Sequence, residues 1–429
     1  METLRIGSTG PHVQLLQIAL ERAGFSPGEP DGIFGARLSS ALRLFQSANR
    51  LYPDAVAGTE THAALCPYYM GYKTHTIKSG DSLYRISMIY GSTVRAIETA
   101  NPEMNPLNLI PGTSLVVPLP FPVVPTNIDF SSTLISFCCR GIAARYPFVA
   151  LSELGKSVMG RPLYTLRLGS GENRVFYNAS HHANEWITTP VLLRFTEELA
   201  RASAFGLNIF RRSARELLRV SSLCAAPCID PDGVDLVTGA LKSGSFFERA
   251  RAISANYPSI PFPSGWKANI LGTDLNLQYP AGWSQAREIK FAQGFTSPAP
   301  RDFVGTEPLS APESRAVYEF TQAYSPSLTL SYHTQGRVIY WKYLDYEPPM
   351  SREIAELFGE TSGYAVEDTP HASGFAGYKD WFIKEFYRPG YTIECGLGTS
   401  PLPISQFEQI YSENLGILTH GLTVTAEID

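Results

Sequence analysis

Hydrophobic and polar positions follow three different patterns along the 429-residue chain. In the first part, apolar side chains recur at helical spacing twice, once from Val13 to Leu20 and again from Leu38 to Phe45. The segment Asp31-Gly-Ile-Phe-Gly35 lies between the two runs and has the composition of a turn. The pattern predicts a small α-helical bundle over residues 1–70.

The second pattern, over residues 73–120, predicts a strand, two short helices and a closing strand. Leu83, Ile86 and Ile89 share one face of the first helix, and we expect Asp81 or Ser82 to cap its start. This order of elements is βααβ, which differs from the purely helical first part. The two regions are therefore expected to be separate domains.

Four prolines fall between Pro118 and Pro125, which predicts an extended, semi-rigid linker over residues 121–128. From residue 129 to 429, short apolar runs alternate with helical stretches. The expected strands lie at 175–177, 222–226, 328–332 and 391–393, and the clearest helices at 191–202 and 310–323. Such alternation predicts an α/β domain in which helices cover both faces of the sheet. The chain as a whole is expected to be multidomain.

Metal-binding residue types follow three of the expected strands. His182 and Glu185 stand three positions apart after the first, His333 ends another, and Glu394 lies in the last. A catalytic zinc ion needs three His, Asp or Glu ligands and one open position. Hydrolysis by zinc-activated water also needs a carboxylate that accepts the proton. The ordered set therefore predicts a hydrolytic zinc site, with ligands meeting at the carboxyl ends of the strands.

The bulk composition is that of a globular protein, with 44% hydrophobic and 17% charged residues. The net charge of -5 leaves no basic excess, so nucleic acid is not an expected partner. No apolar run reaches the length of a membrane span, and the start of the chain lacks the features of a signal peptide. We expect the six cysteines to be buried free thiols, with a Cys224 to Cys228 disulfide as the less favoured alternative.

Both N-terminal regions resemble known wall-binding domains. The phrases Gly7-Ser-Thr-Gly-Pro-His-Val-Gln-Leu-Leu16 and Asp31-Gly-Ile-Phe-Gly35 resemble the peptidoglycan-binding domain of bacterial wall hydrolases. Ser79-Gly-Asp-Ser-Leu, Ala100-Asn-Pro and Ile110-Pro-Gly-Thr are similar to the landmarks of a LysM domain, which binds glycans containing N-acetylglucosamine. These resemblances imply that peptidoglycan glycan is a partner.

The third region, from residue 129 onward, resembles the zinc carboxypeptidase family typified by carboxypeptidase A. The matching motifs are His182-Ala-Asn-Glu185-Trp, Pro231-Asp-Gly, Gly272-Thr-Asp274-Leu-Asn276, Ser331-Tyr-His333 and Thr392-Ile-Glu394. The resemblance implies a mixed sheet covered by helices on both faces and one zinc ion held by His182, Glu185 and His333. It also implies that Glu394 is the general base and that Asp274 holds the His182 ring by its other nitrogen. His181 is expected to be a structural residue or a polar part of the wall of the site.

Several departures from the family pattern concern substrate binding. Leu277 follows Asn276 where the family has an arginine, so the bidentate clamp on a C-terminal carboxylate is missing at that position. Lys267 matches the family's oxyanion-stabilising arginine. Lys379 lies near the pocket position that contacts the residue after the cut, or else is a surface lysine. His371 is a stand-in for the family's phenolic proton donor, or else a solvated loop residue.

One subgroup of the family accommodates these departures. Asp274-Leu-Asn-Leu-Gln-Tyr-Pro-Ala-Gly-Trp283 and Gly377-Tyr-Lys-Asp-Trp-Phe382 resemble the bacterial γ-D-glutamyl-L-diamino acid endopeptidases of sporulating bacilli. The resemblance implies cleavage between γ-D-glutamate and meso-diaminopimelate in peptidoglycan stem peptides or muropeptides, where Lys379 meets the extra carboxylate of diaminopimelate.

Two alternatives remain at this point, a carboxypeptidase that trims wall peptides and a non-catalytic peptidoglycan-binding protein. In the first, an arginine elsewhere, such as Arg337, replaces the missing clamp; the second predicts broken metal ligands. With no visible signal peptide, we expect action in the cytoplasm or a forespore, or outside the cell if a signal peptide has been removed.

Overall fold

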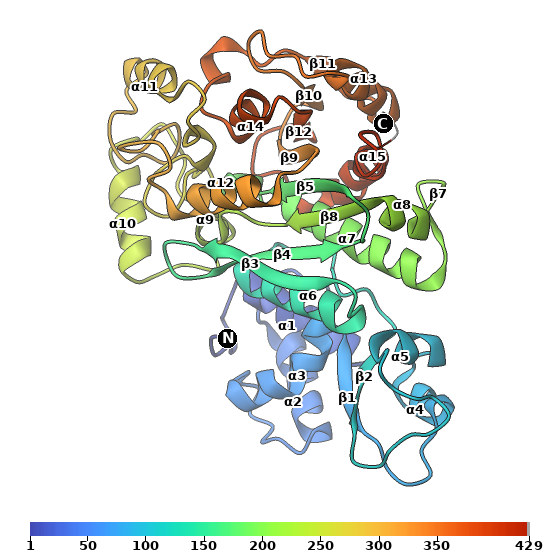
Figure 1. Ribbon diagram of the computed structural model, residues 1–429. Coiled ribbons are helices and arrows are strands. Elements are labelled where there is room, and N and C mark those ends of the chain that lie inside the picture. The colour runs from blue at the N-terminus through green and yellow to red at the C-terminus, as the bar shows by residue number, and fades with distance from the viewer. Residues whose placement is uncertain (427–429) are drawn as a thin grey trace. The chain divides into compact units, whose positions relative to one another are not determined.

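The structure is a computed structural model, and it describes residues 1–426. Its internal contacts divide the chain into two units. The first comprises Met1–Asp129 and Thr133–Leu151, and the second comprises Phe130–Ser132 and the chain from Ser152 onward. Figure 1 labels the elements of both units. No helix of the described part is long and apolar enough to cross a membrane.

The first unit begins with three helices, α1 (Pro11–Arg22), α2 (Ala36–Ala48) and α3 (Thr59–Met70). The two runs identified in the sequence form α1 and α2 and supply the core, where Val13, Leu16, Leu42 and Phe45 are fully buried. The prediction of a small helical bundle is confirmed. The third helix was not predicted, because it buries few apolar residues, chiefly Leu65 and Tyr69, and contains an internal proline.

A βααβ module follows, consisting of β1 (Tyr72–Thr76), α4 (Leu83–Tyr90), α5 (Val94–Ala100) and β2 (Ser114–Pro118). The two strands pair antiparallel. Of the two predicted caps, Ser82 is the one used, since its hydroxyl accepts from the Arg85 amide at 3.2 Å. Asp81 instead binds the His75 ring and the Lys78 amide, which fixes the turn ahead of the helix.

The proline-rich segment 121–128 contains neither helix nor strand, but it does not behave as a solvated spacer. Val123 and Val124 are buried, and the Arg22 guanidinium donates to the Pro122 carbonyl at 2.8 Å. Helix α6 (Ser132–Arg145) continues this packing, with the Phe137 ring stacked 5.0 Å from Tyr69. The segment therefore packs within the first unit, and the boundary expected near residue 129 stays a prediction.

An eight-stranded sheet in the order β11-β10-β12-β9-β5-β8-β4-β3 belongs to the second unit, except for the first two residues of β3. The strands are β3 (Ala150–Lys156), β4 (Pro162–Leu168), β5 (Asn173–Ala179), β8 (Ser221–Ala226), β9 (Leu328–Thr334), β10 (Val338–Tyr340), β11 (Ala365–Glu367) and β12 (Gly390–Cys395). The central run β12, β9, β5 and β8 is parallel, whereas β10 pairs antiparallel with β12 and β4 antiparallel with β8. The predicted mixed sheet is confirmed.

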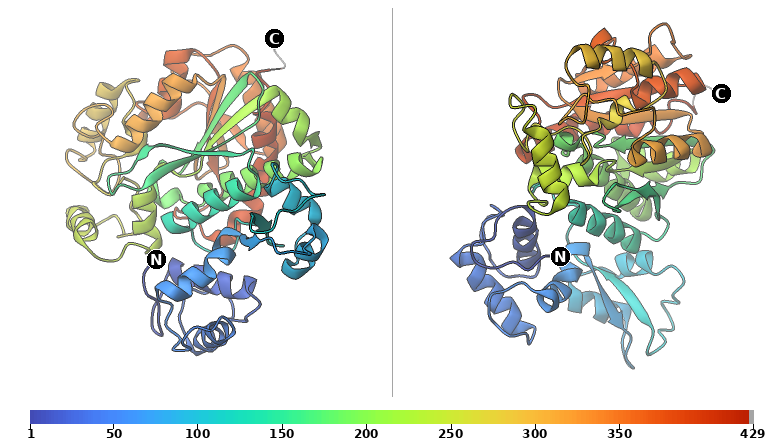
Figure 2. Two further views of the ribbon diagram at one scale, coloured as in Figure 1. Left: turned by 60° about the horizontal axis from the view of Figure 1, so that its bottom comes forward. Right: turned by 90° about the vertical axis from the view of Figure 1, so that its left-hand side faces the viewer.

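Helices cover both faces of this sheet, as Figure 2 shows. The helices of the second unit are α7 (Thr188–Phe205), α8 (Ala214–Val220), α9 (Pro231–Thr238), α10 (Ser245–Ser254), α11 (Trp283–Ala292), α12 (Pro312–Tyr324), α13 (Ser351–Ser362), α14 (Tyr378–Phe386) and α15 (Phe407–His420), of which α10 and α11 lie to the side of the sheet. A small hairpin, β6 (Asn208–Ile209) and β7 (Arg212–Ser213), lies between α7 and α8.

Adjacent residues of β5 show why both faces must be covered. Phe176 packs against Phe320 of α12 at 5.0 Å between ring centroids, whereas the Tyr177 hydroxyl donates to the Leu418 carbonyl of α15. Successive side chains of a strand point to opposite faces, so two consecutive large aromatics bury themselves only if helices lie on each side. The six cysteines are free thiols, including Cys224 and Cys228, so the disulfide alternative is wrong.

Candidate active site

The three predicted metal ligands come from neighbouring parallel strands. His182 lies three residues after the end of β5, Glu185 ends the short 3-10 helix Ala183–Glu185, and His333 lies in β9. Strand β5 pairs parallel with β9, with Ala179 opposite Tyr332. Because parallel strands end at the same edge of the sheet, this register brings the two histidines together.

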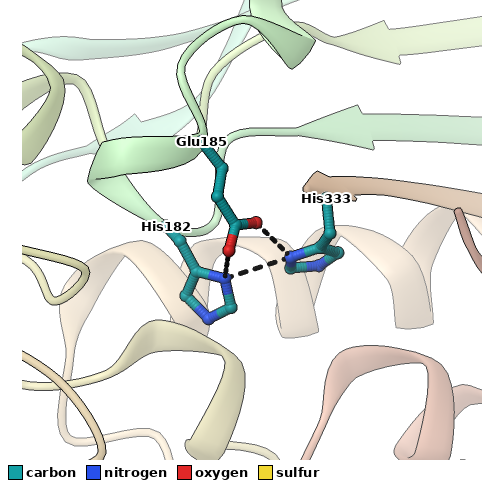
Figure 3. Close-up of side chains that lie close together, drawn as sticks. All are labelled: His182, Glu185 and His333. Atoms are coloured by element: carbon teal, nitrogen blue, oxygen red, sulfur yellow. Dashed lines mark hydrogen bonds and ion pairs between the residues drawn. The ribbon is translucent and has the colours of Figure 1, made fainter. Parts of the chain in front are cut away.

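The donor atoms of these residues converge, as Figure 3 shows. The Nδ1 atom of His333 lies 2.8 Å from Oε2 of Glu185, and Nδ1 of His182 lies 3.0 Å from Oε1. The two Nδ1 atoms face each other at 3.1 Å. All three side chains are buried.

This donor set fits a zinc ion. Two imidazole nitrogens that face each other cannot both carry protons without repulsion, whereas two lone pairs and a carboxylate together suit a divalent cation. Two His and one Glu leave one tetrahedral position open, as catalytic zinc sites do. The alternative of a binding protein with broken metal ligands is therefore wrong.

Two charged residues, Asp274 and Lys267, contact the metal ligands. Oδ1 of Asp274 lies 3.1 Å from Nε2 of His182, the contact expected for an orienting carboxylate. The Lys267 ammonium lies 3.3 Å from Oε1 of Glu185. Burial raises the pKa of Glu185, but His182 and Lys267 outweigh it and hold that pKa well below its usual range. Glu185 is therefore ionised, as a metal ligand must be.

Glu394 lies in β12 directly opposite His333 in β9. It lines a cavity of about 120 Å³ together with His182, Lys267, Asp274, Asn276, Leu277, Lys290, Asp302, His333, Tyr340, Thr369, Ser373, Gly377, Lys379, Asp380 and Thr392. Burial and, after it, the negative charge of Glu185 raise the pKa of Glu394 to about 8. A carboxyl with a raised pKa beside a metal site has the properties of a general base.

The cavity wall includes the predicted substrate-binding residues Asn276 and Lys379. The Asn276 side-chain oxygen accepts from the Tyr378 amide at 2.9 Å, which fixes the side chain against helix α14. Lys379 is buried, and its ammonium lies 2.8 Å from Asp380 and 3.0 Å from the Thr369 hydroxyl. The sequence suggested a lone cation at this position, whereas the structure shows an ion pair in the cavity wall.

Two sequence candidates lie elsewhere. His371 is exposed and does not line the cavity, because its ring packs edge-on against Phe375 at 5.1 Å. The proton-donor interpretation of His371 is therefore corrected in favour of a loop residue. Arg337 pairs with Glu413 at 2.8 Å and lies over the Tyr364 ring, so it does not supply the missing clamp.

His181 is structural, as expected. It is fully buried, with Nε2 3.0 Å from the Tyr279 hydroxyl, and its ring stacks on His333 at 6.0 Å. Burial and the neighbouring histidines hold the pKa of His181 well below its usual range, so the ring is neutral.

Sequence reasoning missed Lys290, Asp302 and Asp380 in the cavity wall, and Arg301 beside it. The first three form ion pairs: Lys290 lies 2.6 Å from Asp302, and Asp380 pairs with Lys379. Only Asp380 carries a sequence signal, as part of the Lys-Asp-Trp phrase. The others stand in a helix and a loop without a recognisable motif, and the fold alone brings them together.

Three family models match the chain: zinc carboxypeptidase over residues 135–416, peptidoglycan binding domain over 9–65 and LysM domain over 75–118. Gamma-D-glutamyl-L-diamino acid endopeptidase 1 of Lysinibacillus sphaericus is 41% identical over 296 residues, which cover 69% of this chain and 72% of that protein.

Two solved structures share the fold. Bovine thrombin-activatable fibrinolysis inhibitor in complex with tick carboxypeptidase inhibitor has a TM-score of 0.55 and 18% identity, covering 71% of this chain and 99% of that one. Carboxypeptidase A from Helicoverpa armigera has a TM-score of 0.53 and 19% identity, covering 70% and 75%. The zinc carboxypeptidase model spans more than half of the chain and includes every converging ligand. The chain therefore belongs to the zinc carboxypeptidase family and is a zinc metallopeptidase that also carries peptidoglycan-binding and LysM domains.

Proposed function

We propose that this peptidase hydrolyses the amide bond between γ-D-glutamate and a diamino acid in peptidoglycan stem peptides or muropeptides, with meso-diaminopimelate as the residue after the cut. The observation that carries the proposal is the 41% identity over 296 residues with the Lysinibacillus sphaericus enzyme, whose name states this bond. The two wall-binding domains support the same polymer, because they tether the enzyme to it and raise the local substrate concentration.

The lining of the cavity supports an endopeptidase. Leu277 stands where the family's carboxylate-binding arginine would be, and Arg337 is engaged with Glu413. A substrate that continues beyond the cleaved bond needs no clamp on a C-terminal carboxylate. These features favour a stem peptide over the C-terminus of an ordinary protein.

The Lys379 and Asp380 pair supports a diamino acid after the cut. The free end of meso-diaminopimelate carries an ammonium and a carboxylate, and the cavity wall presents one group of each sign 2.8 Å apart. Lysine, which offers only the ammonium, leaves Lys379 without a new partner. We therefore propose that Lys379, with Asn276, orients the leaving residue.

The chemistry follows from the positions of Glu394 and Lys267. His182, Glu185 and His333 would hold zinc, which, when bound, polarises the amide carbonyl and lowers the pKa of water. Glu394 accepts the proton of the attacking water and donates it to the leaving amine. Lys267, 3.3 Å from Glu185, stabilises the negative charge that develops on the carbonyl oxygen. Asp274 keeps the His182 ring oriented.

A defined tetrapeptide tests the proposal. L-Ala-γ-D-Glu-meso-diaminopimelyl-D-Ala is incubated with the zinc-loaded protein, and the products are identified by mass spectrometry. We expect L-Ala-D-Glu and diaminopimelyl-D-Ala. Release of D-Ala alone identifies a carboxypeptidase and contradicts the proposal. The same peptide with lysine in place of diaminopimelate measures the contribution of the second carboxylate.

We further propose that the protein acts on wall material in the cytoplasm or forespore of a sporulating bacterium, a prediction that rests on the resemblance to the enzymes of sporulating bacilli. Fractionation of sporulating cells, followed by detection of the protein in each fraction, tests this. Recovery from the culture medium alone contradicts it.

A further inference from the structure

The lysines that line the active-site cavity already have partners. Each ammonium lies close to a carboxylate of the same wall: Lys267 with Glu185 at 3.3 Å, Lys290 with Asp302 at 2.6 Å and Lys379 with Asp380 at 2.8 Å. A substrate carboxylate that binds one of them must share it with a protein carboxylate. The proposed substrate nevertheless has carboxylates on both sides of the cleaved bond, because a γ-linked glutamyl residue keeps its α-carboxylate free.

Arg301 is a cation beside this cavity whose terminal guanidinium nitrogens are available to bind a carboxylate. Its side chain is 45% exposed, and its Nε atom donates to Oδ2 of Asp302 at 2.6 Å. Among residues 1–426, no described group bonds to its two terminal nitrogens. A guanidinium held by Nε presents both terminal nitrogens side by side, the geometry that binds a carboxylate with two hydrogen bonds.

The backbone holds Arg301 beside the metal ligands. The amide of the next residue, Asp302, donates to Oδ2 of Asp274 at 3.2 Å, and the other oxygen of Asp274 holds His182. The carbonyl of the preceding residue, Pro300, accepts from the Lys267 amide at 2.7 Å. Burial lowers the pKa of Arg301, but Asp302, Asp274 and Glu185 outweigh it and raise that pKa. Arg301 and Lys267 therefore lie on the same side of the metal ligands.

Lys379 belongs to a different wall. Its ammonium contacts the Lys342 carbonyl, which follows β10, and Thr369, which follows β11. Since Lys267 is assigned to the carbonyl oxygen of the cleaved amide, its neighbour Arg301 faces the acyl part of the substrate. Lys379 is assigned to the leaving residue.

We propose that Arg301 forms a carboxylate-binding subsite for the free α-carboxylate of the γ-linked D-glutamyl residue. The inference rests on the proposed function, since it assumes that this residue supplies the acyl group. It gives a reason for γ-glutamyl selectivity: an ordinary α-linked peptide has no carboxylate at that point of its backbone, and it leaves the two terminal nitrogens of Arg301 without a carboxylate to bind. The family's carboxylate-binding arginine is replaced here by Leu277. Arg301 supplies a bidentate carboxylate contact from a different position in the sequence.

Two matched substrates test the subsite. One is the stem tetrapeptide with free D-glutamate, and the other carries D-isoglutamine, in which an amide replaces only the α-carboxylate. For the wild-type protein we expect kcat/KM to favour the acid by about 10- to 100-fold, the range for a hydrogen bond to a charged group. Arg301→Ala should bring this ratio close to one, and Arg301→Lys should restore part of it, since an ammonium keeps the charge but not the fork.

The variants are expected to fold. When Arg301 is removed, Asp302 keeps Lys290 at 2.6 Å, so no buried carboxylate is left unpaired. Zinc content and thermal midpoint verify this. Arg249→Ala on the exposed surface of α10 is the matched control, and its acid-to-amide ratio should equal that of the wild type.

Product binding separates the subsite from catalysis. L-Ala-D-Glu should bind the zinc-loaded wild type about 10- to 100-fold more tightly than L-Ala-D-isoglutamine in calorimetry, and Arg301→Ala should remove the difference. Equal affinity of the two dipeptides overturns the subsite even if the tetrapeptide is cleaved as proposed. A second result also overturns the subsite. If the selectivity lost in Arg301→Ala is that between diaminopimelate and its amidated form, the guanidinium binds the leaving residue instead. Cleavage at another bond, with the dipeptide preference intact, would contradict the proposed function and leave the subsite standing.

Discussion

The Nε2 atom of His182 lies 3.1 Å from Oδ1 of Asp274, a residue 92 positions further along the chain. The contact leaves Nδ1 of His182 directed at Glu185 and His333. The other oxygen of Asp274 accepts from the Asp302 amide, so the carboxylate itself is fixed. His333 has no such support, because its Nε2 is buried without a hydrogen-bond partner among the described residues. One of the two metal-binding rings thus depends on a carboxylate and the other on packing.

Replacing Asp274 by asparagine should weaken zinc binding. The change removes the negative charge that orients the His182 ring and keeps its Nδ1 free to bind the metal. Hydrogen bonds of this kind to a metal ligand are typically worth about 10- to 100-fold in metal affinity or activity. Competition with a chromogenic zinc chelator measures the affinity. An affinity equal to that of the wild type would show that packing alone orients the ring.

Replacing Glu394 by glutamine should abolish hydrolysis and leave zinc in place. Glu394 is not one of the three converging ligands, and loss of a general base costs about 10²- to 10⁴-fold in rate. Zinc content by elemental analysis and kcat on the tetrapeptide are the two measurements. Glu385→Gln, an exposed change on α14, is the control and should retain both. Substantial turnover by Glu394→Gln contradicts the assignment.

Zinc should stabilise the folded protein. A ligand that binds only the native state raises the free energy of unfolding, by about 2.7 kcal/mol at a free concentration one hundred times its dissociation constant. The thermal midpoint should therefore rise with added zinc and fall with a chelator. His333→Ala removes one of three ligands and should abolish most of the zinc-dependent rise. A rise of wild-type size in His333→Ala would mean that zinc stabilises the protein at another place.

The acid limb of the pH profile should report on Glu394. Burial and the negative charge of Glu185 raise the pKa of this carboxyl to about 8, even though Lys267 and His182 act to lower it. A base must lose its proton to act, so kcat/KM rises with pH through this limb. Bound zinc adds positive charge, so we expect the limb of the zinc-loaded protein to lie below pH 8.

Removing the cation in Lys267→Met should move the limb to higher pH, because one of the charges that lower the pKa of Glu394 is lost. The profile of kcat/KM against pH for both proteins is the measurement. A lower kcat with an unmoved limb would limit Lys267 to stabilising the carbonyl oxygen.

Much of the fold was predictable because its signals are local. The period of the apolar residues identified α1 and α2, and Ser82 caps α4 as one of the two predicted candidates. Short apolar runs identified β5, β8, β9 and β12. Helix α3 was not predicted because two buried apolar residues and an internal proline give no clear period.

The zinc ligands were also predictable, since His182, Glu185 and His333 stand at strand ends and are of the residue types that bind zinc, in an order that chance rarely produces. The same reasoning failed for His371. Its motif position suggested chemistry, but the loop places it against Phe375 and away from the cavity. Residue type indicates which reactions are possible, and backbone geometry decides which side chains take part.

The amino-acid sequence was sufficient to identify the domain types, the metal-binding residues and the lack of an arginine after Asn276. The arrangement of charge around the metal ligands became visible only in the folded chain: Lys379 paired with Asp380, Lys290 with Asp302, and the Arg301 terminal nitrogens bonded to no group among residues 1–426. Periodicity and capping act over a few residues, so they can be recognised in the sequence. An ion pair between a helix and a loop depends instead on distances that the tertiary structure sets.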